Sequence, residues 1–124
     1  MSANGRDPAR RVVVTGLGIV GPLGIGWEET WSAALAGRSG AGPITRFDAS
    51  ELACRIACEA RGFEPGDFID RRSARRMDRS SQMAVAAARL ALDDADLEID
   101  GDGYRAGTVI ATGNCMYAAP RKFD

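Results

Sequence analysis

The sequence predicts an α/β fold in one domain, because short apolar runs of strand type alternate with segments of helical type over 124 residues. Residues 11–15 and 108–112 are β-branched and apolar, which is typical of short strands buried on both faces of a sheet. Residues 83–92 contain a single polar side chain and many alanines. This composition predicts a helix inside a layered structure, with close approach of its neighbours.

A second helix is predicted over residues 27–36. Glu28 and Glu29 fall in its first turn, where they favour the helix dipole, and Gly37 ends it. Four of its apolar side chains share one face: Trp27, Trp31, Ala34 and Leu35.

The segments between the two helices are predicted to be irregular or extended. Residues 37–48 form a Gly- and Pro-rich connection without a helical period. Apolar and charged residues alternate over 54–58, which favours an extended segment, although residues 52–60 also allow a helix. A turn is predicted at 101–103.

Composition indicates a soluble chain with no strong electrostatic bias. The formal net charge is −1, and no run approaches the roughly 20 apolar residues of a membrane helix. Residues 1–10 lack the apolar centre of a signal peptide and are expected to form a flexible polar tail. We therefore expect a cytoplasmic protein with no membrane contact.

Two residue counts limit the chemistry of this chain. There are no histidines, which excludes a Ser-His or Cys-His pair within it. The three cysteines, Cys54, Cys58 and Cys115, are expected to be reduced. Cys54 and Cys58 have no further ligands to complete a zinc site, so no metal is expected and buried thiols are favoured instead.

Gly16, Gly18 and Gly21 form a G-x-G-x-x-G pattern directly after the first apolar run. This pattern is typical of dinucleotide-binding turns, which also need a helix that starts in the turn and an acidic residue about 20 positions later. Here the helix is delayed to about Trp27, and no acidic residue stands at the second position. The glycines are therefore interpreted as a sharp turn between a strand and a packed loop, and no bound cofactor is expected.

Five arginines lie within nine residues of this nearly neutral chain: Arg71, Arg72, Arg75, Arg76 and Arg79. If the segment is helical throughout, the last four form one basic ridge. Arginine suits carboxylate and phosphate groups, so an acidic protein or a phosphorylated carrier is predicted as partner, against a simple solvated face. No aromatic residue lies between the arginines to stack on bases, which disfavours nucleic acid.

These segments together resemble the amino-terminal part of β-ketoacyl-acyl carrier protein synthases. The resemblance covers about residues 10–113 and involves RRVVVTGLGIVGPLG (10–24), W-x-x-x-W-x-x-x-L-x-G-x-S-G-x-x-x-I-x-x-FD (27–48), and RRSARRMD (71–78) before the alanine-rich helix. It implies a thiolase-like layered fold, in which residues 11–124 form the amino-terminal part of the first half. The glycine segment then belongs to the first core strand, and no nicotinamide is bound.

The activity that the resemblance implies is decarboxylative condensation in fatty-acid or polyketide synthesis. A cysteine takes an acyl group from acyl carrier protein, and two histidines help to decarboxylate malonyl-carrier protein. The family places all three groups downstream of these segments. We therefore expect an acyltransferase by descent that is catalytically incomplete alone, has no catalytic residue in this chain, and is a homodimer as the complete enzyme.

The resemblance also implies two binding regions. Arg72, Arg75 and Arg76 match positions that face the acidic helix of acyl carrier protein, with Arg71 beside them. Where the family has a glycine-rich stretch lining the acyl pocket, Asn114 and Cys115 stand here, and their bulk would narrow an acyl channel.

Two alternatives remain open from sequence. One is a non-catalytic module that docks carrier protein or a synthase partner, and the other is a nucleotide-binding oxidoreductase. For the synthase fragment we expect exposed apolar surface from Val109 onward unless other polypeptide covers it.

Overall fold

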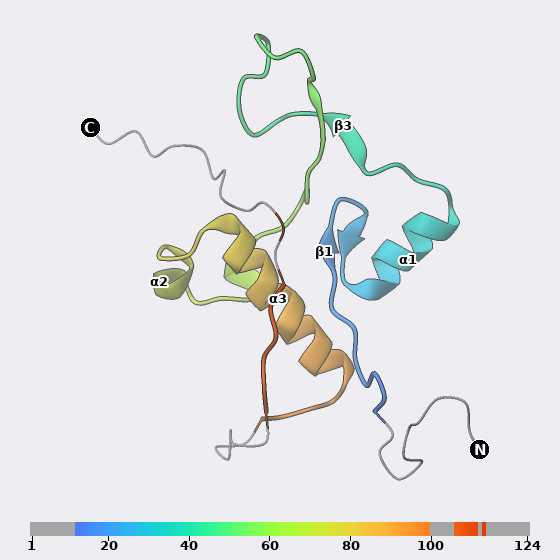
Figure 1. Cartoon of the computed structure of the whole chain (residues 1–124), viewed down its shortest axis with the longest axis vertical. Helices are drawn as coiled ribbons and strands as arrows, with labels where there is room; N and C mark the ends of the chain where they lie inside the picture. The colour runs from blue at the N-terminus through green and yellow to red at the C-terminus, as the bar shows by residue number, and fades with distance from the viewer. Residues whose placement is uncertain (1–11, 100–105, 112, 114–124) are drawn as a thin grey trace, which may run out of the picture.

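The computed structural model describes residues 12–99, 106–111 and 113. Figure 1 shows the longest helix in the middle, with the first helix and strand on one side and a short helix on the other. The elements in chain order are β1 (Val20–Gly21), β2 (Gly24–Ile25), α1 (Trp27–Leu35), β3 (Ala41–Pro43), β4 (Ile56–Cys58), the 3-10 helix η1 (Pro65–Asp67), α2 (Arg71–Ala74) and α3 (Arg79–Asp94).

The strands form two small antiparallel pairs. In β1–β2, Gly21 is paired with Gly24 across a tight turn. Of the three glycines that were interpreted as a turn, Gly21 lies there, whereas Gly16 and Gly18 lie in the segment before β1, where no strand is assigned. In β3–β4, Ala41 is paired with Cys58 at one end of the register. The extended interpretation of residues 54–58 is therefore confirmed, and the alternative helix over 52–60 is wrong.

Helix α1 begins at Trp27, as predicted, and ends one residue earlier than expected. Gly37 has a φ of 63° and its N–H donates to the Ala34 carbonyl at 3.0 Å, so a residue without Cβ closes the helix. The side that α1 buries carries Ala33, whereas Trp31 and Leu35 are exposed. The large apolar side chains of this helix are therefore available to another surface.

Helix α3 is confirmed and is longer than the predicted segment, but it is not buried all round. Ala86 is fully buried, whereas Ala84, Ala88 and Arg89 are exposed. Among the described residues, the segment before β1 and the 3-10 helix η1 both contact α3, and part of the helix surface faces solvent. The expected burial on all sides is therefore wrong for this part of the chain.

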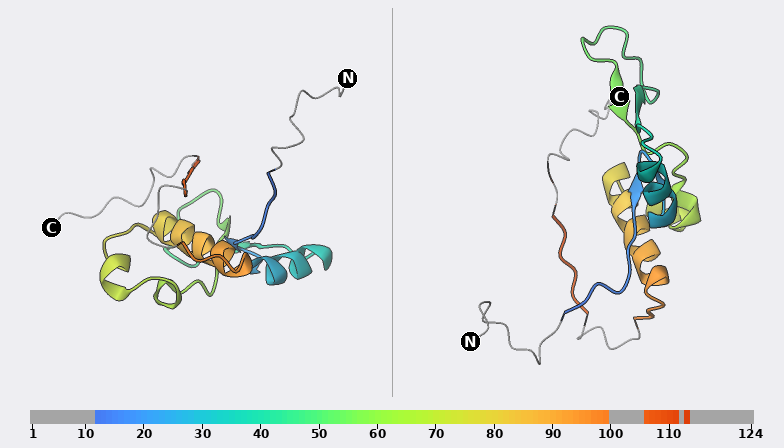
Figure 2. Two further views of the ribbon diagram at one scale, coloured as in Figure 1. Left: turned by 90° about the horizontal axis from the view of Figure 1, so that it is seen from below. Right: turned by 90° about the vertical axis from the view of Figure 1, so that its right-hand side faces the viewer.

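The close contact on α3 explains two glycines of the G-x-G-x-x-G pattern. A Cβ on Gly16 would meet the Ala91 carbonyl and lie 2.8 Å from the Ala95 Cβ, and a Cβ on Gly18 would meet the Ala87 carbonyl. Residues two apart on an extended segment thus face alanines four apart on a helix. The right-hand view of Figure 2 shows this segment running alongside α3.

The two predicted buried strands do not form within the described residues. No strand is assigned at 12–15 or 108–111. Val12 and Val109 are each 97% exposed, and Ile110 is 70% exposed, so the expectation of exposed apolar surface around Val109 is confirmed. A strand needs a hydrogen-bonded neighbour, and the described residues supply none for either segment.

The core formed by the described residues is small. Five of their apolar side chains lie below the surface: Ala33, Ala49, Phe63, Ile69 and Ala86. Phe63 stacks against Phe68 with ring centroids 6.0 Å apart, which joins the loop after β4 to η1. No helix within the described ranges is both long and apolar enough to cross a bilayer.

Candidate functional site

The predicted arginine site begins at an aspartate cap. Asp70 Oδ1 accepts hydrogen bonds from the Ser73 N–H at 2.9 Å and the Arg72 N–H at 3.1 Å, which starts α2. The bonds from Ser73, followed by that from Arg72 and the charge of Arg89, hold the pKa of Asp70 below its usual range. The carboxylate that lies nearest in sequence to Arg71 is therefore occupied with backbone N–H groups.

A second cap interrupts the arginine segment. Asp78 Oδ1 accepts from the Ser80 hydroxyl at 2.6 Å and the Ser81 N–H at 2.7 Å, and α3 begins there. These bonds, with that from the Ser80 hydroxyl the largest, lower the pKa of Asp78. The Gln82 side chain in α3 donates to the carbonyl of Ala74, the last residue of α2, at 2.8 Å, so this hydrogen bond links the two helices across the turn between them.

The prediction that four arginines form one continuous helical ridge is therefore wrong. Helix α2 ends at Ala74, and Arg75 and Arg76 lie in the turn before α3. Arg79 faces elsewhere: its Nη2 donates to the Ala60 and Phe63 carbonyls at 3.2 and 3.4 Å, and its guanidinium lies 5.0 Å from the centre of the Phe63 ring. Arg79 thus anchors α3 to the loop after β4.

The other four arginines remain together as an exposed basic segment, which we call the α2 basic surface: Arg71, Arg72, Arg75 and Arg76. Within the described part of the chain, none of their side chains has an ion pair or a hydrogen bond to a protein group. The neighbouring aspartates are both occupied as caps. The surface therefore presents four guanidinium groups with which no described carboxylate forms an ion pair.

Sequence reasoning missed Arg89 as a neighbour of this surface. It is the single polar residue in the alanine-rich part of α3, it is exposed, and its charge contributes to the lowered pKa of Asp70 at the start of α2. The pattern contained a usable signal, because a lone arginine on an otherwise apolar helix marks the side that faces solvent.

The predicted acyl-pocket residues Asn114 and Cys115 lie outside the described residues. The expected burial of the other two thiols is wrong, since Cys54 and Cys58 are both exposed on or beside the β3–β4 pair. This pair is a two-stranded ribbon whose faces are largely open, which leaves the thiols uncovered. Within the described residues, no three His, Cys, Asp or Glu side chains gather as metal ligands would.

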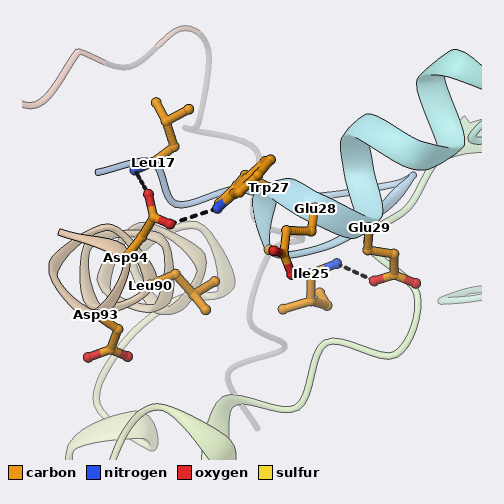
Figure 3. A pocket seen from close by; sticks show the side chains of 9 residues that line it. Leu17, Ile25, Trp27, Glu28, Glu29, Leu90, Asp93 and Asp94 are labelled. Atoms are coloured by element: carbon orange, nitrogen blue, oxygen red, sulfur yellow. Dashed lines mark hydrogen bonds between the residues drawn. The ribbon is translucent and has the colours of Figure 1, made fainter. Parts of the chain in front are cut away.

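A hollow of about 410 Å³ lies beside the glycine motif and the start of α1. Figure 3 shows Asp94 of α3 joining two segments there: its carboxylate accepts from the Leu17 N–H and the Trp27 Nε1–H, both at 2.8 Å. Four carboxylates line this hollow: Glu28, Glu29, Asp93 and Asp94. This concentration of negative charge disfavours an anionic coenzyme at the place where a dinucleotide turn would hold its pyrophosphate.

Comparison with known proteins identifies a family. The family described as "Beta-ketoacyl synthase, N-terminal domain" matches residues 9–124. The chain is 46% identical over 105 residues to 3-oxoacyl-[acyl-carrier-protein] synthase 2 of Synechocystis sp., and 48% identical over 105 residues to the protein of the same name in Coxiella burnetii. In both cases the alignment covers 84% of this chain and 25% of the relative, so the chain spans about a quarter of their length.

A solved structure extends the likeness to three dimensions. The structure titled "The ishigamide ketosynthase/chain length factor" superposes with a TM-score of 0.67 at 50% identity, covering 72% of this chain and 22% of that one. The likeness in sequence and in backbone covers most of this chain and does not rest on the glycine pattern alone. The chain belongs to the β-ketoacyl synthase family, whose N-terminal domain it matches over residues 9–124.

Proposed function

We propose that this chain supplies the amino-terminal part of a condensing enzyme, and that its α2 basic surface docks acyl carrier protein. The observation that carries the proposal is the set of four exposed arginines, none of which has an ion pair within the described chain. This chain is also similar to proteins named 3-oxoacyl-[acyl-carrier-protein] synthase 2. A surface of this kind steers and orients an acidic partner more than it adds affinity by area.

The reaction of the full-length protein is decarboxylative condensation of an acyl thioester with malonyl-carrier protein. The family resemblance implies a thiolate nucleophile and two histidines for it, and this sequence contains no histidine. The chemistry also needs hydrogen-bond donors for the developing enolate and oxyanion. We propose that these groups act outside this chain, and that this chain contributes framework and carrier-protein recognition.

The same proposal extends to the architecture. The complete domain is a thiolase-like layered fold, and the exposed residues 12–15 and 106–111 take their places in its sheet. Their exposure in the described chain supports this assignment, because β-branched apolar runs of this type are rarely left in solvent. The full-length protein acts as a homodimer in the cytoplasm.

A charge-reversal titration tests the docking proposal. Arg75→Glu combined with Arg76→Glu should weaken binding of acyl carrier protein by about tenfold or more at low salt, because the acidic partner then meets like charge (~1.4 kcal/mol). The difference should shrink as salt is raised, since both residues are exposed. Calorimetry or fluorescence anisotropy measures both quantities.

The matched control is Arg38→Glu combined with Arg55→Glu, which changes the net charge by the same amount at exposed sites away from α2. If the control variant loses as much affinity as the α2 variant, the effect comes from net charge and the docking proposal is wrong. Equal affinity of the α2 variant and the unmodified chain at low salt would also reject it.

A further inference from the structure

A second basic site lies in the loops at the start of α3, where Arg79 is, whereas the carboxylate-lined hollow includes Asp93 and Asp94 at the end of that helix. After β4, the chain comes down to the start of α3 (Figure 1), and a hollow of about 300 Å³ forms there. Three arginines and two glutamates line it: Arg46, Arg61, Arg79, Glu59 and Glu64. At roughly 30 Å³ per water molecule, it has room for a small hydrated ion.

The carboxylate oxygens of Glu59 are already occupied as hydrogen-bond acceptors within the protein. Its carboxylate accepts from the Thr45 N–H at 3.0 Å, the Thr45 hydroxyl at 2.7 Å and the Arg46 N–H at 3.3 Å, and its side chain is only 10% exposed. Its Oε2 also lies 3.9 Å from Arg61 Nε. The hydrogen bond from the Thr45 hydroxyl, followed by that from the Thr45 N–H, lowers the pKa of Glu59. The carboxylate therefore remains ionised, and its oxygens accept several hydrogen bonds from the protein.

The arginines, by contrast, keep unused donors. Arg79 uses Nη2 for two carbonyls, and no described acceptor meets its Nε or Nη1. Arg61 uses its Nη2 on the Pro43 carbonyl at 3.1 Å. The Arg46 guanidinium has no hydrogen bond or ion pair with any described residue.

The lining has three arginines against two glutamates, so it has a net positive formal charge before anything binds. Burial, followed by the charge of Arg46, lowers the pKa of Arg79, and the charges of Glu64 and Glu59 act in the opposite direction. The two guanidinium groups therefore repel one another, and the glutamates offset this repulsion in part. Arginine remains protonated despite such shifts, so the repulsion persists at neutral pH. A multivalent anion is the ligand that relieves it and fills the unused donors.

We infer that this hollow is a binding site for a tetrahedral oxyanion of the phosphate class, held by Arg46, Arg61 and Arg79. The site is separate from the α2 basic surface, because Arg79 points to the loop after β4 and not along α2. It goes beyond the proposed carrier-protein docking and does not depend on it.

Inorganic phosphate is the probe, titrated into the isotope-labelled chain and followed by amide NMR. We expect shifts at Thr45, Arg46, Arg61 and Gly62, and about tenfold weaker binding in Arg46→Gln, which removes charge-assisted donors. This substitution should preserve the fold, because the Arg46 side chain has no bond within the described protein. Arg38→Gln is the control with the same charge change and should bind phosphate normally.

Two further arms identify the chemistry. Dimethyl phosphate tests whether an esterified phosphate is accepted as well as the free ion, and acetate should bind at least tenfold more weakly than phosphate because it carries less charge. Arg75→Glu with Arg76→Glu should leave phosphate binding unchanged, whatever it does to carrier-protein docking. Phosphate shifts that map to α2, equal weakening by Arg38→Gln, or no shifts at all would overturn the inference.

Discussion

Replacement of Gly18 by alanine is the sharpest test of how the glycine motif is used. If the glycines serve the contact with α3, a single methyl group there should destabilise the fold in the absence of any ligand. The new Cβ would meet the Ala87 carbonyl, and it would lie 2.6 Å from the Ala91 nitrogen and 2.9 Å from the Ala87 carbonyl carbon. All three atoms belong to the helix backbone, which cannot move aside as a side chain does.

The cost follows from the displacement that is required. Non-bonded heavy atoms are comfortable at about 3.5–4.0 Å, so the segment has to move away from α3 by about 1 Å. That movement breaks the bond from the Leu17 N–H to Asp94, now 2.8 Å long. Overpacking of this kind costs about 1–3 kcal/mol and the lost hydrogen bond about 1 kcal/mol more. We expect a total loss of about 2–4 kcal/mol, a large fraction of typical domain stability.

Urea unfolding measures the effect, with tryptophan fluorescence and helical circular dichroism as signals. Gly66→Ala is the matched control, because nothing lies within 4 Å of its Cβ position and its φ is not in the left-handed region. That substitution should be neutral or stabilise by about 0.4–1 kcal/mol. Equal unfolding midpoints for the Gly18→Ala and Gly66→Ala variants would refute the packing explanation of the motif.

Further predictions concern the hydrogen bonds that organise the two sites. Asp94→Ala should destabilise the chain by about 1–3 kcal/mol and shift the emission of Trp27, because both the indole and the Leu17 N–H lose their acceptor, whereas Asp93→Ala should change neither. The caps should make helicity pH-dependent: since the pKa of Asp78 is lowered in the folded chain, its stabilisation is complete above the ordinary aspartate value and is lost as the pH falls from that value through the lower folded value. Asp78→Asn retains a capping oxygen but does not titrate, so its circular dichroism should fall less steeply over that range, and an identical slope would contradict this assignment.

The elements that could be predicted from sequence are those determined by local chemistry. Helix α1 was predictable from acidic residues in its first turn and from Gly37 after its end. Helix α3 was predictable from its composition, and its alanines do meet a close neighbour. The turn between Gly21 and Gly24 is local as well, since its strands are separated by two residues.

The break inside the arginine segment was missed, although its signal is present in the sequence. Asp78 is followed by Ser80 and Ser81, which is the pattern of a helix N-cap with nearby donors. Charge spacing alone favoured one helix and placed Arg79 with the other arginines. The structure instead gives Arg79 two carbonyls and an aromatic face, contacts between residues 16 and 19 positions apart that no local pattern contains.

The absence of the two predicted strands from the described residues has a different cause. A β-branched run determines that a segment can be extended, but its hydrogen bonds must come from a neighbour elsewhere in the chain. Val12 and Val109 lie in such runs and are almost fully exposed, because the described residues offer no partner strand to either run.

The apolar pattern therefore indicated correctly that these segments can be extended, but it contained no information about the strands with which they would pair. The same reasoning applies to Trp31 and Leu35, which are exposed on α1. The contact between the segment before β1 and α3 is made by small residues, Gly16 and Gly18 against alanines of α3, whereas Phe63 and Ile69 are buried near η1. Among the described residues, the large apolar side chains at Val12, Val109, Trp31 and Leu35 are exposed, which in the described chain leaves an apolar surface uncovered.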